Sequence, residues 1–209
     1  MTLLEPAVAL TDFALAIECG LFAVWLNRLG SARFQPAFVV LFTATGVAAS
    51  LGGISHGFLP GSDFVWRATL IAICVAAFAT WLIGARLTLS EEYQKVITAL
   101  AALAFAIQAA YILFVDASFL IAILGYVPAA LFLLIAFGLA YRRSHASFLL
   151  AGIGGVALTL LAAVVQQSEI GLHARYFDHN AFYHLIQGVA LFLLFWAARG
   201  LVKSPSQRG

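Results

Sequence analysis

Charged residues are scarce in this sequence: only 10% of its 209 residues are Asp, Glu, Lys or Arg. Hydrophobic residues make up 64%, and the mean hydropathy is +1.02. Soluble domains carry about 25% charged residues, because their surfaces face water. The composition therefore excludes a soluble enzyme and a disordered protein, and it indicates a chain surrounded by lipid. A formal net charge of +2 is also too small for many phosphate contacts, so we expect no nucleic-acid partner.

Cysteine is equally scarce. The two cysteines, Cys19 and Cys74, lie inside apolar runs, so we expect reduced packing residues and no disulfide scaffold. No Lys or Arg precedes Arg28. The first apolar run therefore lacks the basic segment that precedes a cleaved signal peptide, and we expect it to stay in the mature protein.

The sequence has instead seven long apolar runs. A helix that crosses about 30 Å of hydrocarbon needs about 20 residues at a rise of 1.5 Å each. Runs of this length cover residues 8–29, 36–59, 63–87, 91–115, 118–141, 144–167 and 180–202. The sequence therefore predicts an all-α fold, a seven-transmembrane helix bundle that forms a single integral-membrane domain over residues 1–209.

Basic residues gather at one end of these predicted spans. With the N-terminus outside, nine of the 11 Lys and Arg residues are cytoplasmic, and only Arg67 and Arg175 lie on the other side. Lys and Arg accumulate in cytoplasmic loops of membrane proteins. We therefore expect an N-out/C-in orientation, in a bacterial inner membrane or its equivalent.

The exoplasmic end of the predicted bundle collects the other polar residues. Four of the five histidines map there: His56, His173, His179 and His184. The acids that map to the same end are Asp12, Asp63, Asp116, Glu169 and Asp178. His56 lies three residues before the end of the second span, and His184 lies four after the start of the last, so both are about 5 Å deep. This matched depth predicts a site on the exoplasmic side.

Further polar residues are expected to line this site. Glu18 lies roughly 10–15 Å deep by helical rise, where a carboxylate costs a few kcal/mol unless it is partnered or protonated. We therefore expect Glu18 to face the bundle interior, where its candidate partners are Gln108, which lies at similar depth, Tyr111, Arg67 and a water or metal. The residues predicted to line the pocket are Glu18, Asp12, Gln108, Asn180 and Gln187.

Two imidazoles at one depth, with carboxylates nearby, suit a divalent metal ion. Catalytic zinc takes three protein ligands and leaves one position for an activated water. The expected ligands are His56 and His184, with His179 as the third from a non-helical turn. Asp63 or Asp178 would act as the general base. The alternative is that these histidines only form hydrogen bonds at the membrane interface.

The residues around these histidines resemble the CREST superfamily, which includes the alkaline ceramidases and the PAQR-like adiponectin-receptor proteins. Residues 52–56 read Gly-Gly-Ile-Ser-His, similar to the family's Ser-x-x-x-His, and residues 180–184 read Asn-Ala-Phe-Tyr-His, similar to the ceramidases' His-Ala-Trp-Trp-His. The resemblance implies a seven-span fold, zinc held by one His of span two and two of span seven, and hydrolysis of lipid amides. Gly52 stands at the family's Ser position, with Ser55 nearby, and Asn180 stands at the position of a zinc-binding His.

Three functions follow from these residues. The first is a zinc-dependent intramembrane hydrolase of a lipid amide or ester, with Asp63, Asp178 and Ser55 as catalytic candidates and His56, His179 and His184 as ligands. The second is a non-enzymatic membrane protein that binds a ligand or translocates protons or a solute. The third is haem ligation by two histidines. The partner expected in the first case is a lipid or lipid-like substrate.

Overall fold

The computed structural model describes residues 4–29, 33–173 and 177–204. Within these ranges the chain forms the helices α1 (Pro6–Arg28), α2 (Gln35–Gly57), α3 (Asp63–Thr88), α4 (Glu91–Phe114), α5 (Phe119–Ser144), α6 (Ser147–Gln167) and α7 (His179–Lys203). They are 21–26 residues long, and each is long and apolar enough to cross a membrane. The predicted all-helical fold with seven such helices is confirmed. Arg175 and Arg208, which entered the count of basic residues, lie outside the described ranges.

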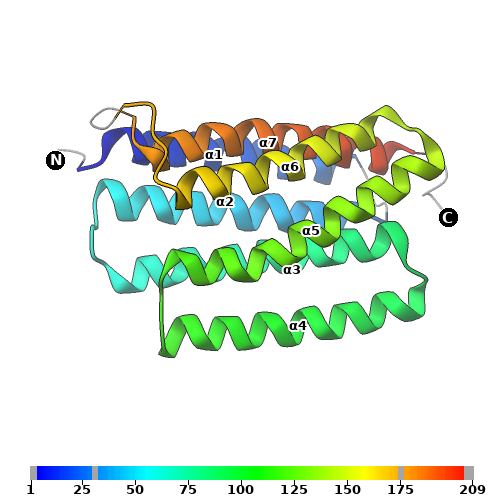
Figure 1. Ribbon diagram of the computed structural model, residues 1–209, viewed down its shortest axis with the longest axis horizontal. Helices are drawn as coiled ribbons and strands as arrows, with labels where there is room; N and C mark the ends of the chain where they lie inside the picture. The colour runs from blue at the N-terminus through cyan, green and yellow to red at the C-terminus, as the bar shows by residue number, and fades with distance from the viewer. Residues whose placement is uncertain (1–3, 30–32, 174–176, 205–209) are drawn as a thin grey trace.

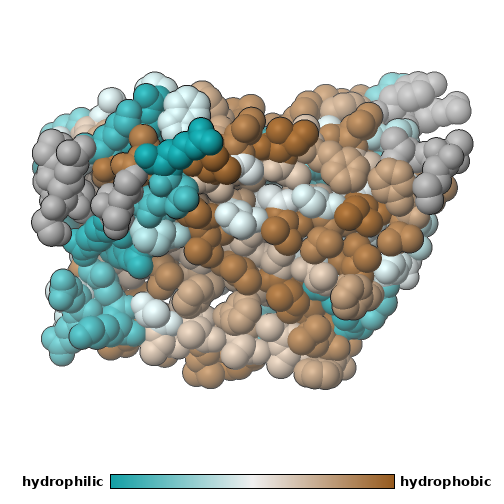
Figure 2. All heavy atoms as spheres, turned by 180° about the vertical axis from the view of Figure 1, so that it is seen from behind, coloured by the Kyte–Doolittle hydropathy of each residue, from teal (hydrophilic) through white to brown (hydrophobic). Residues whose placement is uncertain are grey.

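Consecutive helices run in alternating directions (Figure 1). The helices α1, α3, α5 and α7 therefore begin at one end of the bundle, where α2, α4 and α6 end. We name it the His56 end, because His56 lies in the last turn of α2. On the face shown in Figure 2, apolar side chains fill the middle, and hydrophilic side chains gather toward the two ends. This is the distribution of a bundle that crosses a lipid bilayer.

Local chemistry explains where helices begin and end at the His56 end. Pro6 occupies the first turn of α1, where a helix has no use for the N–H that proline lacks. Asp178 caps α7, because its Oδ1 accepts a hydrogen bond of 2.9 Å from the backbone N–H of Ala181. Gly61, which follows Pro60, adopts a left-handed φ of 79° in the turn between α2 and α3, a conformation that glycine allows.

All helices except α4 contribute many side chains to the packed core. Its largest fully buried aromatic side chains are Phe34, Phe38, Phe42 and Phe137. In contrast, the only buried residues of α4 are Ala101 and Ile112, and this helix lies at the edge of the bundle beside α3 (Figure 1). The other six helices therefore enclose the interior in which a site can form.

Close helix contact at α6 and α7 depends on one glycine. A Cβ atom added to Gly155 would lie 2.8 Å from the carbonyl oxygen of Ala190 and 3.0 Å from the backbone nitrogen of Leu194. Small residues permit such backbone approach between membrane helices, where van der Waals packing drives association. Gly155 therefore belongs to the surface on which α6 and α7 pack closely.

Candidate functional site

A cavity of about 310 Å³ lies in the half of the bundle nearest the His56 end. Residues of α1, α2, α3, α5, α6 and α7 line it, and its deepest lining residues are Thr45 and Ala76, about 18–20 Å along their helices from that end by helical rise. Beneath it, Tyr126 and Thr159 also border a narrow void that has no room for a water molecule. Within the described part of the chain, the cavity is therefore blind toward the opposite end.

The cavity wall is mainly apolar, with aromatic rings and a few polar groups. Its aromatic residues are Trp66, Phe119, Tyr126 and Tyr183. Its other polar residues are Asp12, Thr45, His56, Thr69, Thr159, Gln166, Asn180, His184 and Gln187. Among the described lining residues there is no Lys or Arg. A mostly apolar pocket with a few convergent polar groups is typical of a binding site for a small ligand.

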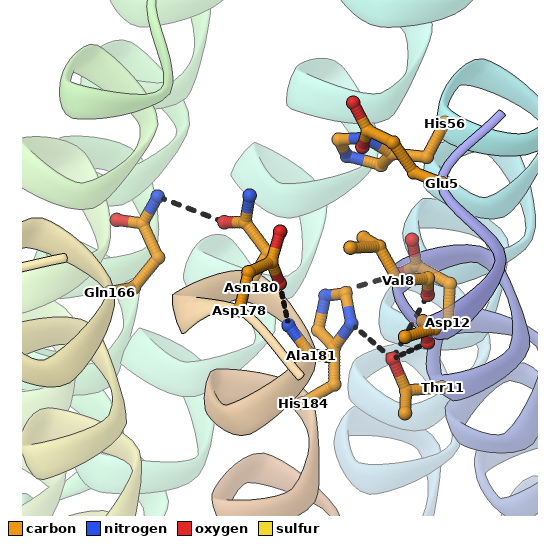
Figure 3. Close-up of polar contacts among 11 residues, drawn as sticks. Glu5, Val8, Thr11, Asp12, His56, Gln166, Asp178, Asn180, Ala181 and His184 are labelled. Atoms are coloured by element: carbon orange, nitrogen blue, oxygen red, sulfur yellow. Dashed lines mark hydrogen bonds and ion pairs between the residues drawn. The ribbon is translucent and has the colours of Figure 1, made fainter. Parts of the chain in front are cut away.

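Asp12 and His184 form the most buried polar contact of this wall. Asp12 Oδ1 on α1 lies 3.2 Å from His184 Nε2 on α7, and the two residues are 4% and 9% exposed. Figure 3 shows the imidazole directed from α7 toward the two α1 residues Thr11 and Asp12. Because both groups are shielded from water, each depends on the other as a hydrogen-bond partner.

Thr11 fixes the orientation of the His184 ring. Its hydroxyl oxygen lies 3.0 Å from His184 Nδ1 and 2.9 Å from the carbonyl oxygens of Ala7 and Val8. A hydroxyl has one proton to donate. In one arrangement Thr11 donates to Nδ1 of His184, and Nε2–H of the same ring donates to the Asp12 carboxylate. In the other arrangement Thr11 donates to a backbone carbonyl oxygen, and Nδ1–H of His184 donates to Thr11. In both cases Nε2 points at Asp12, beside the cavity.

Two glycines of α2 make room for Asp12. A Cβ atom added to Gly52 would lie 3.1 and 3.2 Å from the two carboxylate oxygens of Asp12, and one added to Gly53 would lie 3.0 Å from the ring of Phe13. Such distances are tighter than ordinary van der Waals contact. The carboxylate of α1 therefore occupies the space beside the position at which the resembled family has its serine. These two glycines thus let α1 pack closely on α2 and leave room for a polar group.

Two buried acceptor atoms in the cavity wall have no hydrogen-bond partner among the described residues: Asp12 Oδ2 and Gln187 Oε1. The amide nitrogen of Gln187 donates to Thr159 Oγ1 at 3.3 Å, so the amide is held while its oxygen stays open. A buried polar atom left without a partner costs about 1–3 kcal/mol. Since both residues line the cavity, N–H or O–H donors on the cavity side would satisfy these two oxygens.

At the rim of the cavity, His56 is tied to the start of α1. Its Nδ1 lies 2.6 Å from Glu5 Oε2, and its ring stands edge-on to Trp66, with centroids 6.1 Å apart. Gln166 donates from Nε2 to Asn180 Oδ1 at 3.4 Å on the opposite side (Figure 3). These side chains are only partly buried, so they border the mouth rather than the interior.

Five of the residues predicted for the site do meet at this cavity: Asp12, His56, Asn180, His184 and Gln187. The matched depth of His56 and His184 thus places both rings on the wall of one cavity. Their nitrogens nevertheless face different carboxylates.

Two of the predicted lining residues lie elsewhere. Glu18 lies against α7 outside the cavity, since a Cβ atom at Gly188 would be 3.2 Å from its Oε2. Gln108 donates to the carbonyl oxygen of Ile121 at 2.8 Å, between α4 and α5. Gln108 is therefore not the partner of Glu18 among the candidates, because α1 and α4 are not neighbours in the bundle.

The remaining candidates also lie off the cavity wall. Asp63 binds Arg67 Nε at 2.7 Å through Oδ2, and Asp178 is the cap of α7. Ser55 is buried in α2, and His179 is the first residue of α7. Neither lines the cavity.

Within the described ranges, no three His, Cys, Asp or Glu side chains are grouped so as to hold one metal ion. His56 faces Glu5, and His184 faces Asp12, as two separate pairs (Figure 3). The described residues therefore do not assemble the three-ligand set that catalytic zinc takes. Zinc binding stays a prediction.

Sequence reasoning missed Thr11 and Glu5, the polar partners of the two histidines. Thr11 is next to Asp12, and Glu5 stands just before Pro6, and neither position has a spacing that connects it with a histidine. The Thr11 contact joins the first helix to the last, and the Glu5 contact joins the start of α1 to the end of α2. The adjacency of Thr11 to an intramembrane acid was the one available signal.

Comparisons with known proteins bear on the family alone. Comparison with curated proteins and with solved structures gives no match. A model of a family of unknown function (DUF6962) matches residues 7–203, a range that includes every residue of the cavity wall. Since the match covers nearly all of the sequence, the chain belongs to this family of unknown function, DUF6962.

Proposed function

We propose that this chain is a multi-pass membrane protein that binds a small amphiphilic ligand in the cavity at the His56 end. The observation that carries this proposal is the pair of buried, unpartnered acceptors, Asp12 Oδ2 and Gln187 Oε1, on the wall of that cavity. A polar head that donates hydrogen bonds satisfies them. Apolar residues such as Leu15 and Ile73 line the same space and suit a hydrocarbon part.

The size of the cavity limits the ligand. About 310 Å³ is at the lower end of the roughly 300–1,000 Å³ common for small-molecule pockets. This favours a ligand with one short apolar chain or ring over a lipid with two acyl chains. The proposed N-out orientation, which rests on the basic residues of the opposite end, makes the exoplasmic side the side of access.

The test uses Trp66 as a reporter, because it is the one tryptophan that lines the cavity. Replacing Trp25, Trp81 and Trp196 by Phe leaves Trp66 alone. In lipid nanodiscs, a medium-chain alcohol is expected to change Trp66 emission saturably as it displaces water. Ala163 lines the cavity, so the larger side chain of Ala163→Phe should occupy part of it and abolish the saturable change.

A matched protein that retains only Trp81 controls for partitioning into the bilayer, since Trp81 stacks on Phe132 away from the cavity. It should show only a linear, non-saturating response. If Trp66 and Trp81 respond alike, or if Ala163→Phe leaves the Trp66 response intact, the binding proposal is wrong.

A second candidate is hydrolysis of a lipid amide or ester, and the contact between Asp12 and His184 favours it. A carboxylate held by an imidazole through Oδ1 can take, at its unpartnered Oδ2, a proton from a water that attacks a carbonyl group. The resemblance to the CREST superfamily supports the same reaction. Here His184 and Asp12 would move the proton, and Thr11 would hold the ring.

Two measurements test this candidate. Fatty acid should be released from ceramide in nanodiscs, and His184→Gln should abolish the release while the protein still folds. Elemental analysis tests the zinc form: stoichiometric zinc that is lost in both His56→Ala and His184→Ala supports it. Protein that contains no zinc and releases no fatty acid would refute the hydrolase and leave the binding proposal in place.

A further inference from the structure

We infer that the ligand of this cavity is a cation, namely an amine that is held as its ammonium ion against Asp12. This inference rests on the proposed binding function. Four features of the described residues support this assignment: the charge of the wall, its hydrogen-bonding groups, its aromatic rings and the charge around its mouth.

The described wall carries an acid and, apart from its two histidines, no basic side chain. Asp12 lies on it, and its described residues include no Lys or Arg. The nearest basic residue of this end, Arg67, is outside the lining and is bound to Asp63 and to the carbonyl oxygen of Ile112. A phosphate or carboxylate head would therefore be buried beside Asp12 without a counter-charge, at a large cost in free energy. A cation at the same place is paired.

The open hydrogen-bonding groups of the wall are acceptors. Asp12 Oδ2 and Gln187 Oε1 both lack a donor, and both residues are less than one-tenth exposed. An ammonium group has three donors and no acceptor, so it matches a wall whose open hydrogen-bonding groups are acceptors. Its hydrogen bond to a carboxylate is charge-assisted, and such bonds are about twice as strong as neutral ones.

Aromatic rings surround the same space. Trp66, Phe119, Tyr126 and Tyr183 all line the cavity. The faces of aromatic rings attract cations, with the strongest attraction at tryptophan. A wall that combines one carboxylate with several rings suits an alkylammonium better than it suits an uncharged head.

Acids outnumber Lys and Arg among the described residues at the end of the bundle where the cavity lies. The described acids of the His56 end, besides Asp12, are Glu5, Asp63, Asp116, Glu169 and Asp178, and Arg67 is the one Lys or Arg described there. At the rim, the imidazole of His56 is held by Glu5. A surface with one sign of charge raises the local concentration of ions of the opposite sign, so cations are drawn toward this opening.

The experiment compares three ligands that share one alkyl chain: a primary amine, an alcohol and a carboxylic acid. Each is titrated into nanodiscs of zwitterionic lipid that hold the Trp66-only protein, with the Trp81-only protein as the partitioning control. We expect the amine to bind at least about tenfold more tightly than the alcohol, as a charged hydrogen bond implies, and the acid to give no saturable change. Asp12→Asn should bring the amine down to the affinity of the alcohol.

Glu18→Gln is the matched control, because it removes a carboxylate from the same helix but not from the cavity wall. It should leave all three affinities unchanged. Equal saturable binding of amine and alcohol, or equal losses in Asp12→Asn and Glu18→Gln, overturns the cationic assignment while the proposed function stands. If no ligand gives a saturable change at Trp66, the proposed function itself fails. Should Asp12→Asn not fold, the ranking of the three ligands on the parent protein decides the question alone.

Discussion

The contact between Asp12 and His184 should couple α1 to α7 by about 1.5–2 kcal/mol of unfolding free energy. Hydrogen bonds to charged groups contribute about 1.5–3 kcal/mol. The distance of 3.2 Å between Asp12 Oδ1 and His184 Nε2 is at the long end of the range for such bonds, which favours the lower part of that interval. Since both residues are less than one-tenth exposed, water screens the interaction little.

A double-mutant cycle measures this coupling. The proteins are the parent, Asp12→Ala, His184→Ala and the double variant, each unfolded reversibly in mixed micelles with increasing SDS and followed by circular dichroism. A control cycle combines Asp12→Ala with Gln108→Ala, whose amide binds between α4 and α5, and it should be additive within about 0.5 kcal/mol. A coupling no larger than that of the control would refute the view that these two side chains interact.

Three further predictions concern the helices around the cavity. Gly155→Ala forces a Cβ atom to within 2.8 Å of a carbonyl oxygen in α7 and should cost about 1–3 kcal/mol, whereas Gly154→Ala, with 3.5 Å of room, should leave thermal unfolding unchanged. Asp178→Ala removes the cap of α7 and should lower the free energy of unfolding by about 1 kcal/mol. Asp178→Asn retains the cap, and it leaves ligand binding and any hydrolysis unaffected if this residue has no catalytic role. With both native cysteines buried, Glu169→Cys should react with an impermeant maleimide from the exoplasmic side and His145→Cys only from the cytoplasmic side. The reverse labelling pattern would reverse the proposed orientation.

The sequence predicted the length and the order of the helices well, because a run of apolar residues long enough to cross a bilayer is a strong signal on its own. The observed bounds are close to the expected ones, and the largest differences are at α5 and α6: α5 continues to Ser144 and α6 starts at Ser147. Polar residues continue α5 beyond its apolar run, and α6 therefore begins later. The depth of His56 and His184 followed from the same counting, and both line the cavity.

Neighbour relations could not be predicted in this way. Hydropathy sets how deep a residue lies, but not which helix its side chain meets. Glu18 and Gln108 were expected at similar depth, and they lie on helices that do not touch. Thr11 was not predicted for the same reason, because its hydrogen bond to His184 depends on α1 and α7 being adjacent. The role of Gly52 likewise required knowing that Asp12 faces it.

The pairing of the first helix with the last has a consequence for biosynthesis. Thr11 and His184 are 173 residues apart, so a ribosome that adds about 5–20 residues per second takes roughly 9–35 s between them. Throughout that interval the nascent α1 carries an acid whose imidazole partner does not yet exist. Until α7 inserts, α1 and α2 alone can shield this carboxylate from lipid, because it packs beside Gly52 of α2.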